Sequence, residues 1–249
     1  ANYLEKISKY PVHILIEKPF APNTSEAKRM IESMKIHNKK LAINWPLAWY
    51  PCHVKAKKIL EKGFIGELRE VHFYDGNRGP LYHLADKIEV SEEEVEKKKK
   101  DSWWYKKELG GGSLLDYLGY GTTLGTWFFN GKKPETVTTI TDKVPNIEVD
   151  QHSITICRYG KYLSKFETKW GTFSDPWTTQ PQPKCGFVLV CEGGTISSYD
   201  FEKYISIQTK KNRDLEKIDV DELPVGKRSP VEYVLDCIEN DKLIEGPLN

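Results

Sequence analysis

Two short segments of the chain combine residue types that can transfer protons or bind a polyol. The first is Glu17-Lys18-Pro19, which directly follows an apolar run. A lysine at the carboxyl end of a strand can donate a hydrogen bond to a substrate oxygen, because open α/β sheets bind their ligands at that edge. Taken alone, the tripeptide favours a simpler interpretation, a solvated loop lysine before a turn proline.

The second segment has three consecutive glycines, Gly110-Gly111-Gly112, followed by Asp116 and Tyr120. If Gly112 or Ser113 caps a helix here, Asp116, Tyr120 and Trp127 fall on nearly one helix face. A carboxylate and a phenol one turn apart could bind a polyol, and glycines let a flat ring approach the backbone. Tight helix packing is the alternative explanation of the same residues.

The chain lacks a recognisable phosphate-binding glycine motif. In Gly119-Tyr120-Gly121-Thr122-Thr123-Leu124-Gly125, the third glycine comes one residue too late for G-x-G-x-x-G. Residues 114–129 also read as one continuous helix with no strand before it. We therefore do not expect this segment to bind a pyrophosphate.

The elements around the first segment predict a parallel α/β arrangement. Residues 12–16 read as a buried strand, and residues 41–45 as another. Between them, Asn23 can cap a helix that has Glu26 three residues later and ends near residues 37–40. Strand, helix and strand in this order form the crossover unit of a parallel sheet.

Strands dominate after a helix that begins at Pro51 and ends before Gly63. They are rich in β-branched and aromatic residues and are separated by turn residues, which predicts an antiparallel sheet. The expected strands are residues 68–74, 136–141, 152–158, 162–169, 187–191 and 204–209. Residues 89–107 read as a solvated helix with i,i+4 ion pairs.

Composition excludes several classes of protein. The chain has 37 Lys and Arg against 36 Asp and Glu, so a strongly basic nucleic-acid binder is excluded. The five cysteines are widely spaced and form no C-x-x-C pair, which predicts reduced thiols, no metal site and a cytoplasmic location. The longest apolar runs are far too short for a membrane span, and the first residues do not resemble a signal peptide.

Three motifs in order resemble the Gfo/Idh/MocA oxidoreductases: Glu17-Lys18-Pro19, residues 62–67 and residues 110–116. The resemblance covers nearly the whole chain. It implies an α/β fold, in which the tail of a Rossmann parallel sheet precedes an α/β domain with a large, open, mostly antiparallel sheet. On this basis we expect residues 1–46 to be the C-terminal remnant of the NAD(P)-binding domain, and residues 47–249 to be the domain for substrate binding and oligomerisation.

The resemblance also implies roles for individual residues. Lys18 matches the family lysine near the nicotinamide and the reacting oxygen, and Asp116 matches the aspartate that contacts substrate hydroxyls. Many members have a histidine four residues later, whereas Tyr120 stands here, as in the glucose-fructose oxidoreductase branch. The implied cofactor is NAD or NADP, held by Glu17, Lys18, Pro19 and Trp45.

The implied reaction is hydride transfer between a sugar, or a sugar-derived polyol, and the nicotinamide. Tyr120 and Lys18 would handle the hydroxyl proton. A phenol is a weak base at neutral pH unless a nearby cation stabilises the phenolate, and Lys18 could supply that charge. Arg78 could bind substrate, and Trp103 or Trp104 could stack on a sugar face. A surface ion pair and core packing explain these three residues at least as well.

Two other functions remain open from the sequence: an NAD-dependent glycoside hydrolase of the same family, and a non-catalytic module that forms homo-oligomers through the open sheet face. We expect the protein to bind neither a membrane nor a nucleic acid. The sequence departs from the family in having no glycine fingerprint before Glu17 and in stopping short at residue 249. We therefore expect the first Rossmann strands and the final helix to be missing, and NAD(P) binding by these residues alone to be weak.

Overall fold

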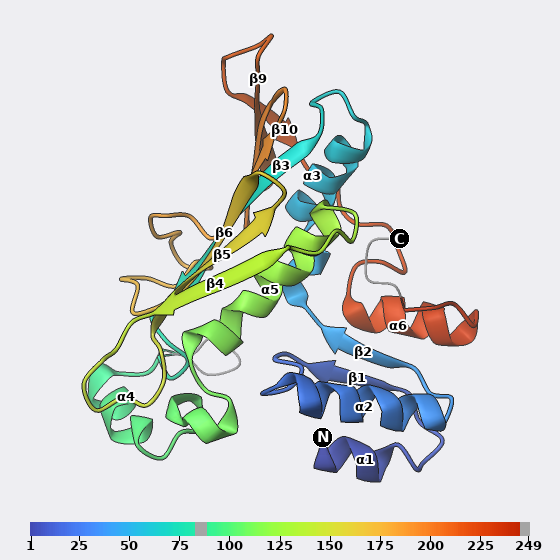
Figure 1. Ribbon diagram of the computed structural model, residues 1–249, viewed down its shortest axis with the longest axis vertical. Coiled ribbons are helices and arrows are strands. Elements are labelled where there is room, and N and C mark those ends of the chain that lie inside the picture. The colour runs from blue at the N-terminus through green and yellow to red at the C-terminus, as the bar shows by residue number, and fades with distance from the viewer. Residues whose placement is uncertain (83–88, 245–249) are drawn as a thin grey trace. The chain divides into compact units, whose positions relative to one another are not determined.

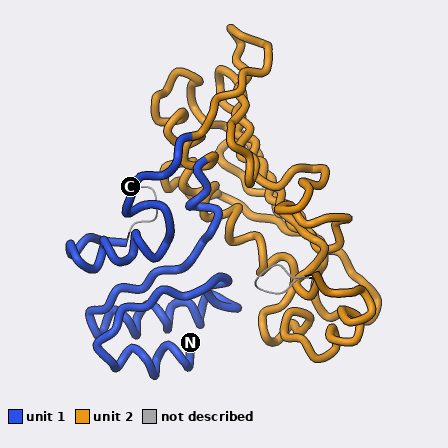
Figure 2. The backbone as a smooth tube through the Cα atoms, turned by 180° about the vertical axis from the view of Figure 1, so that it is seen from behind, with its two compact units in different colours: residues 1–51, 221–249 blue, residues 52–220 orange. Residues whose placement is uncertain are grey.

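The computed structural model describes residues 1–82 and 89–244, and it divides the chain into two compact units (Figure 2). Unit 1 contains residues 1–51 together with the C-terminal residues from 221, and unit 2 contains residues 52–220. The expected division after residue 46 therefore differs from the compact units, chiefly because the C-terminal segment joins unit 1 instead of the large sheet.

Unit 1 is built on two parallel strands, as the sequence predicted. Its elements are α1 (Asn2–Ile7), β1 (Ile14–Glu17), α2 (Thr24–Ile36), β2 (Leu41–Asn44), η1 (Pro46–Trp49) and α6 (Pro230–Glu239). Strands β1 and β2 pair in parallel from Ile14↔Leu41 to Glu17↔Asn44. The Asn23 side chain caps α2 by accepting a hydrogen bond from the backbone N of Glu26 at 2.9 Å.

Helix α6 belongs to unit 1 because its apolar face is buried there. Tyr233, Val234 and Cys237 form one buried cluster with Ala42 of β2. The Trp49 ring packs on this cluster and lies 5.4 Å from the Tyr233 ring. Removing these side chains from water is the main stabilisation that the helix gains, and it fixes the C-terminal segment to unit 1.

Unit 2 is dominated by one eight-stranded sheet (Figure 1). Its helices are α3 (Pro51–Glu61), α4 (Glu92–Lys99), η2 (Trp103–Tyr105), η3 (Lys107–Leu109) and α5 (Ser113–Phe128). Its strands are β3 (Leu68–Asn77), β4 (Thr136–Thr141), β5 (His152–Tyr159), β6 (Tyr162–Trp170), β7 (Gly186–Cys191), β8 (Gly194–Tyr199), β9 (Tyr204–Thr209) and β10 (Glu216–Asp219).

The sheet order is β10-β9-β8-β7-β3-β6-β5-β4. Every neighbouring pair is antiparallel except β3 and β6, which are parallel. The predicted mixed α/β class with a large, mostly antiparallel sheet is therefore confirmed. All six strands predicted for this region are present, and β8 and β10 are additional.

Helix α5 packs across one face of this sheet and is close to β3, β5 and β6 (Figure 1). A Cβ atom added at Gly121 would lie 2.4 Å from Phe73 Cδ1, and one at Gly125 would lie 2.9 Å from Phe166 Cε1. Both distances are too short for real contacts, so these two glycines are required for the helix to approach the sheet. For them, the packing interpretation of the glycine-rich helix is confirmed.

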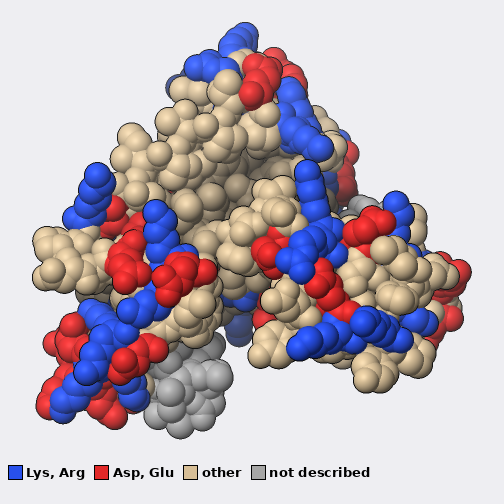
Figure 3. Space-filling view, turned by 60° about the horizontal axis from the view of Figure 1, so that its bottom comes forward, with Lys and Arg blue, Asp and Glu red and all other residues tan. Residues whose placement is uncertain are grey.

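The charged segment between residues 89 and 107 is not one continuous helix, because it contains the α-helix α4 and, separately, the short 3-10 helix η2. Its lysines and glutamates form i,i+4 pairs, Lys97 with Glu93 at 2.6 Å and Lys98 with Glu94 at 3.9 Å. Figure 3 shows acidic and basic side chains interspersed on the surface of the molecule. Across the described residues, no helix is long and apolar enough to cross a membrane, and all five cysteines are free and buried.

Candidate functional site

The three glycines before α5 form the turn that starts the helix. Gly110 and Gly112 have φ values of 83° and 110°, in the left-handed region that favours glycine. A Cβ atom at Gly111 would lie 2.1 Å from the Trp104 carbonyl oxygen. Backbone geometry therefore requires the glycines, and they bring the start of α5 against the Trp103-Trp104 turn.

The N-terminus of α5 is capped from outside the helix. Gly112 stands at the N-cap position and supplies no side-chain cap. Instead Asp150 Oδ2 accepts hydrogen bonds from Ser113 Oγ at 2.7 Å and from the backbone N of Leu114 at 2.8 Å. A carboxylate at this position also interacts favourably with the helix dipole. Sequence reasoning missed Asp150, because nothing local distinguishes it from other loop aspartates.

Asp116 lies in the first turn of α5 and is almost completely buried, with 5% of its surface exposed. Its Oδ2 atom accepts a hydrogen bond from Trp170 Nε1 at 2.9 Å. Tyr120 follows one turn later and is also buried, with its ring 6.3 Å from that of Tyr117. The structure therefore brings the predicted carboxylate and phenol into one buried region and adds Trp170 to them.

Tyr117 lies among these acidic groups and is unsuited to proton transfer. Burial first, and then the negative charges of Asp116 and Asp75, raise the pKa of Tyr117 well above its ordinary value. Its phenol therefore stays protonated across the physiological pH range. Asp75 itself comes from β3 and is buried, so the carboxyl end of β3 and the start of α5 share this region.

Aromatic rings pack around Trp170. Trp103 and Trp104 stack with their ring centroids 3.8 Å apart. The Trp104 ring then meets Trp170 edge to face at 6.3 Å, and Tyr105 lies 5.4 Å from Trp170. Trp103 keeps 40% of its surface exposed. The structure thus connects both predicted tryptophans to Asp116 through Trp170.

Arg78 directly follows β3, and two carboxylates hold its guanidinium. Asp175 Oδ2 accepts from Arg78 Nε at 3.0 Å, and Glu89 pairs with Arg78 Nη2. Asp175 is buried, so the pair fastens the loop after β6 to the end of β3. These contacts favour the ion-pair interpretation of Arg78 over a role in binding substrate.

The predicted cofactor residues gather at one edge of unit 1. Glu17, Lys18 and Pro19 lie at the carboxyl end of β1, and Asn44 and Trp45 at the carboxyl end of β2, the same edge because the strands are parallel. Asn44 Nδ2 donates to Glu17 Oε1 at 2.8 Å. Asn44 Oδ1 is buried with no hydrogen-bond partner in the described part of the chain. Such an acceptor fits a donor supplied by a bound molecule.

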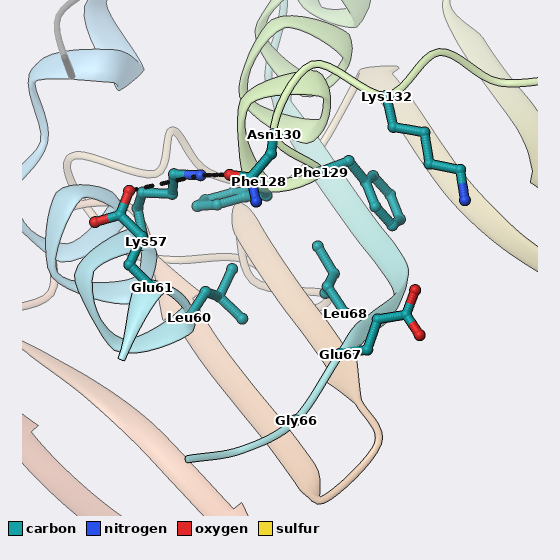
Figure 4. Close-up of a pocket in the computed structure, with 10 residues that line it drawn as sticks. All are labelled: Lys57, Leu60, Glu61, Gly66, Glu67, Leu68, Phe128, Phe129, Asn130 and Lys132. Atoms are coloured by element: carbon teal, nitrogen blue, oxygen red, sulfur yellow. Dashed lines mark hydrogen bonds and ion pairs between the residues drawn. The ribbon is translucent and has the colours of Figure 1, made fainter. Parts of the chain in front are cut away.

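A separate cavity of about 240 Å³ lies within unit 2, between α3, the start of β3 and the end of α5 (Figure 4). At its edge Lys57 Nζ donates to the Trp127 carbonyl oxygen at 2.9 Å and to Asn130 Oδ1. Burial lowers the pKa of Lys57, against the opposing effect of Glu61. Lys57 therefore caps the C-terminal end of α5. This cavity lies at the start of β3, whereas Asp75 lies near the other end of that strand.

Comparisons with known proteins agree with this architecture. The sequence profile of the GFO/IDH/MocA C-terminal domain matches residues 53–197, more than half of the chain. A trans-1,2-dihydrobenzene-1,2-diol dehydrogenase of Xenopus laevis is 29% identical over 126 residues, which cover 51% of this chain and 32% of that protein. The chain therefore spans about a third of the length of this curated relative.

Solved structures show the same fold. An oxidoreductase from Agrobacterium radiobacter, in complex with NAD+, L-tartaric acid and magnesium, is 16% identical with a TM-score of 0.68, covering 98% of this chain and 68% of that one. A levoglucosan dehydrogenase in complex with NADH and levoglucosan is 17% identical with a TM-score of 0.69, covering 88% and 58%. The sheet topology, the glycine-led helix α5 and the matching profile lead to one conclusion: this chain belongs to the GFO/IDH/MocA family of oxidoreductases.

Proposed function

We propose that the protein is an NAD(P)-dependent dehydrogenase that oxidises a hydroxyl of a sugar or sugar-derived polyol. The observation that carries this proposal is the buried pair Asp116 and Tyr120, one helical turn apart at a capped and hydrogen-bonded helix start. The family membership and the names of the solved relatives support the same reaction class.

The cofactor is NAD or NADP in this proposal, and residues 1–46 are the end of its binding domain. Glu17, Lys18, Pro19 and Trp45 hold it at the carboxyl edge of β1 and β2. Asn44 Oδ1, which is buried and has no hydrogen-bond partner among the described residues, supports this assignment, since it offers an acceptor at that edge. When bound, the nicotinamide supplies the carbon that accepts the hydride.

The chain's own residues orient the substrate and move the proton. Asp116 accepts hydrogen bonds from substrate hydroxyls and so fixes the carbon that reacts. Tyr120 takes the proton of the reacting hydroxyl, and Lys18 is the second residue that handles this proton in the proposed reaction. Lys18 belongs to unit 1, whereas Asp116 and Tyr120 belong to unit 2.

A cyclic vicinal diol of lower polarity is a second substrate candidate. The partly exposed Trp103, stacked on Trp104, favours it, because an aromatic ring can bind the apolar face of another ring. The curated relative is named as a dehydrogenase of such a diol. Sugars also present an apolar face to tryptophan, so these tryptophans are compatible with both substrate classes.

We further propose a cytoplasmic homo-oligomer that associates through the sheet face opposite α5. Half-buried apolar side chains on that face support the association, among them Ile154 and Ile156 of β5 and Val188 and Val190 of β7. The register places Lys165 and Glu167 of β6 on the same face, so a second copy of the sheet would cover a mixed apolar and charged surface.

The test incubates the full-length protein with NAD+ or NADP+ and a panel of sugars, cyclitols and cyclic trans-diols. Formation of reduced nicotinamide is measured for the wild type, Asp116→Asn and Tyr120→Phe. We expect turnover by the wild type and a fall in kcat of about 10²- to 10⁴-fold in Tyr120→Phe. Tyr162→Phe, on β6, is the matched control. No turnover on the whole panel, or full activity in both site variants, would refute the proposal.

A further inference from the structure

Trp170 is a buried residue at the end of β6 whose indole N–H has a defined partner. Its side chain is 3% exposed, and Nε1 donates to Asp116 Oδ2 at 2.9 Å. The two residues are 54 positions apart in sequence. An indole N–H can only donate, so Trp170 and the acceptor-only carboxylate of Asp116 are complementary.

The surrounding contacts leave the indole little freedom to turn. The Trp104 ring meets it edge to face, and the Tyr105 ring lies at an angle of 50° to it. The backbone of Trp170 is fixed as well, because its N donates to the Gln151 carbonyl oxygen at 2.7 Å and its Cα pairs with that of Asn77 in the sheet. The sheet and the aromatic rings therefore constrain the direction of the N–H.

We propose that Trp170 is a positioning residue for Asp116: its indole N–H fixes one carboxylate oxygen and so sets the orientation in which Asp116 meets the substrate. This inference rests on the proposed function, in which Asp116 binds substrate hydroxyls. Trp170 then has a second role besides packing against Trp104 and Tyr105, because it also donates the hydrogen bond that orients the carboxylate.

A purely structural explanation is that Asp116 only satisfies a buried N–H, which would otherwise lower stability. The two explanations differ in what the loss of the N–H does. If Trp170 positions Asp116, a variant without the indole N–H loses turnover when Asp116 is present, but loses nothing further when the Asp116 carboxylate has already been removed. If the pair is structural, the variant loses stability, and kcat changes no more than in a matched tryptophan variant.

The test uses the full-length protein with Trp170→Phe, which keeps an aromatic ring but removes the donor. Trp127→Phe, the same change at the far end of α5, is the control. We expect Trp170→Phe to lower kcat about 10- to 100-fold, as for the loss of one hydrogen bond to a charged group, with a smaller change in KM. In an Asp116→Ala background, where the indole N–H has no acceptor at position 116, Trp170→Phe should have no further effect, because residues that act through one another are not additive.

A measurement independent of turnover completes the test. The indole N–H resonance that disappears in Trp170→Phe is assigned to Trp170, and it should move upfield in Asp116→Ala while that of Trp127 stays in place. An unmoved Trp170 resonance, or an equal fall in kcat in both backgrounds, would overturn the proposal. If the wild type oxidises nothing on the panel, the proposed function fails, and the resonance alone decides whether Trp170 holds Asp116.

Discussion

Asp150 Oδ2 accepts a hydrogen bond from Ser113 Oγ at 2.7 Å across 37 positions of sequence. The same oxygen accepts from the backbone N of Leu114, and the Asp150 carbonyl oxygen accepts from the Ser113 N at 3.0 Å. A loop before β5 thus caps the helix that carries Asp116 and Tyr120. The position of the candidate site depends on a residue outside it.

Asp150→Ala should destabilise the protein by about 1–3 kcal/mol, because it removes the cap of α5 and one of the two hydrogen-bond partners of the buried Ser113 hydroxyl. The free energy of unfolding from urea titration measures this. Asp101→Ala, on an exposed aspartate, should change it by less than about 0.5 kcal/mol. Equal effects of the two substitutions would contradict the capping role.

Gly121→Ala should cost about 1–3 kcal/mol, since the new methyl group would overlap Phe73 and push α5 away from the sheet. The control is Thr123→Ala on the same helix, which we expect to be nearly neutral. Thermal unfolding of the two variants compares them directly. A Gly121→Ala protein as stable as the wild type would show that α5 does not pack as described.

His53 should make stability fall at alkaline pH. Burial would lower its pKa, but Cys52 and Asp200 outweigh burial and raise the pKa to about 10, with His53 Nε2 2.8 Å from Asp200 Oδ1. The folded state therefore binds the proton more tightly than the unfolded state, so the stabilisation is complete below the unfolded pKa of about 6.5 and is lost as pH rises toward 10.

The expected slope is a loss of about 1.4 kcal/mol per pH unit in the wild type between pH 7 and 9. His53→Gln should remove that slope, and His37→Gln, on an exposed histidine, should keep it. Urea titrations at several pH values provide the comparison. The same slope in wild type and His53→Gln would rule out a charged His53 in the folded protein.

Lys57→Met should destabilise α5 by about 1–3 kcal/mol, because the Trp127 carbonyl oxygen and Asn130 Oδ1 lose their buried donor. Lys132→Met, at the rim of the same cavity (Figure 4), should be close to neutral. Amide hydrogen exchange of residues 124–128 is the appropriate measurement, since it reports opening of that end of the helix. Unchanged exchange would contradict the role of Lys57.

Local signals predicted much of the fold. Asn23 and Glu26 located the start of α2, and the apolar run from residue 114 located α5 to within one residue of its observed ends. Helix α6 had a comparable signal, since Ser229 Oγ accepts from the backbone N of Glu232, and it was overlooked. Strand β8 has no such signal, because its small polar residues become a strand only by pairing with β7 and β9.

Part of the candidate site was also predictable from local sequence signals. Asp116 and Tyr120 lie one turn apart on one helix, so their spacing is visible in the sequence. Asp150 and Trp170 reach the site through the sheet, from 36 and 54 positions away. Such contacts are set by the strand order, which local patterns do not specify.

In the proposed reaction, Lys18, Asp116 and Tyr120 are all required for hydride transfer to the nicotinamide. The most direct measurement is the initial rate of nicotinamide reduction by the full-length protein and its Lys18→Ala variant, with Lys28→Ala on α2 as the control. We expect kcat to fall about 10²- to 10⁴-fold in Lys18→Ala and to stay unchanged in Lys28→Ala. An unchanged rate in Lys18→Ala would contradict the proposed reaction.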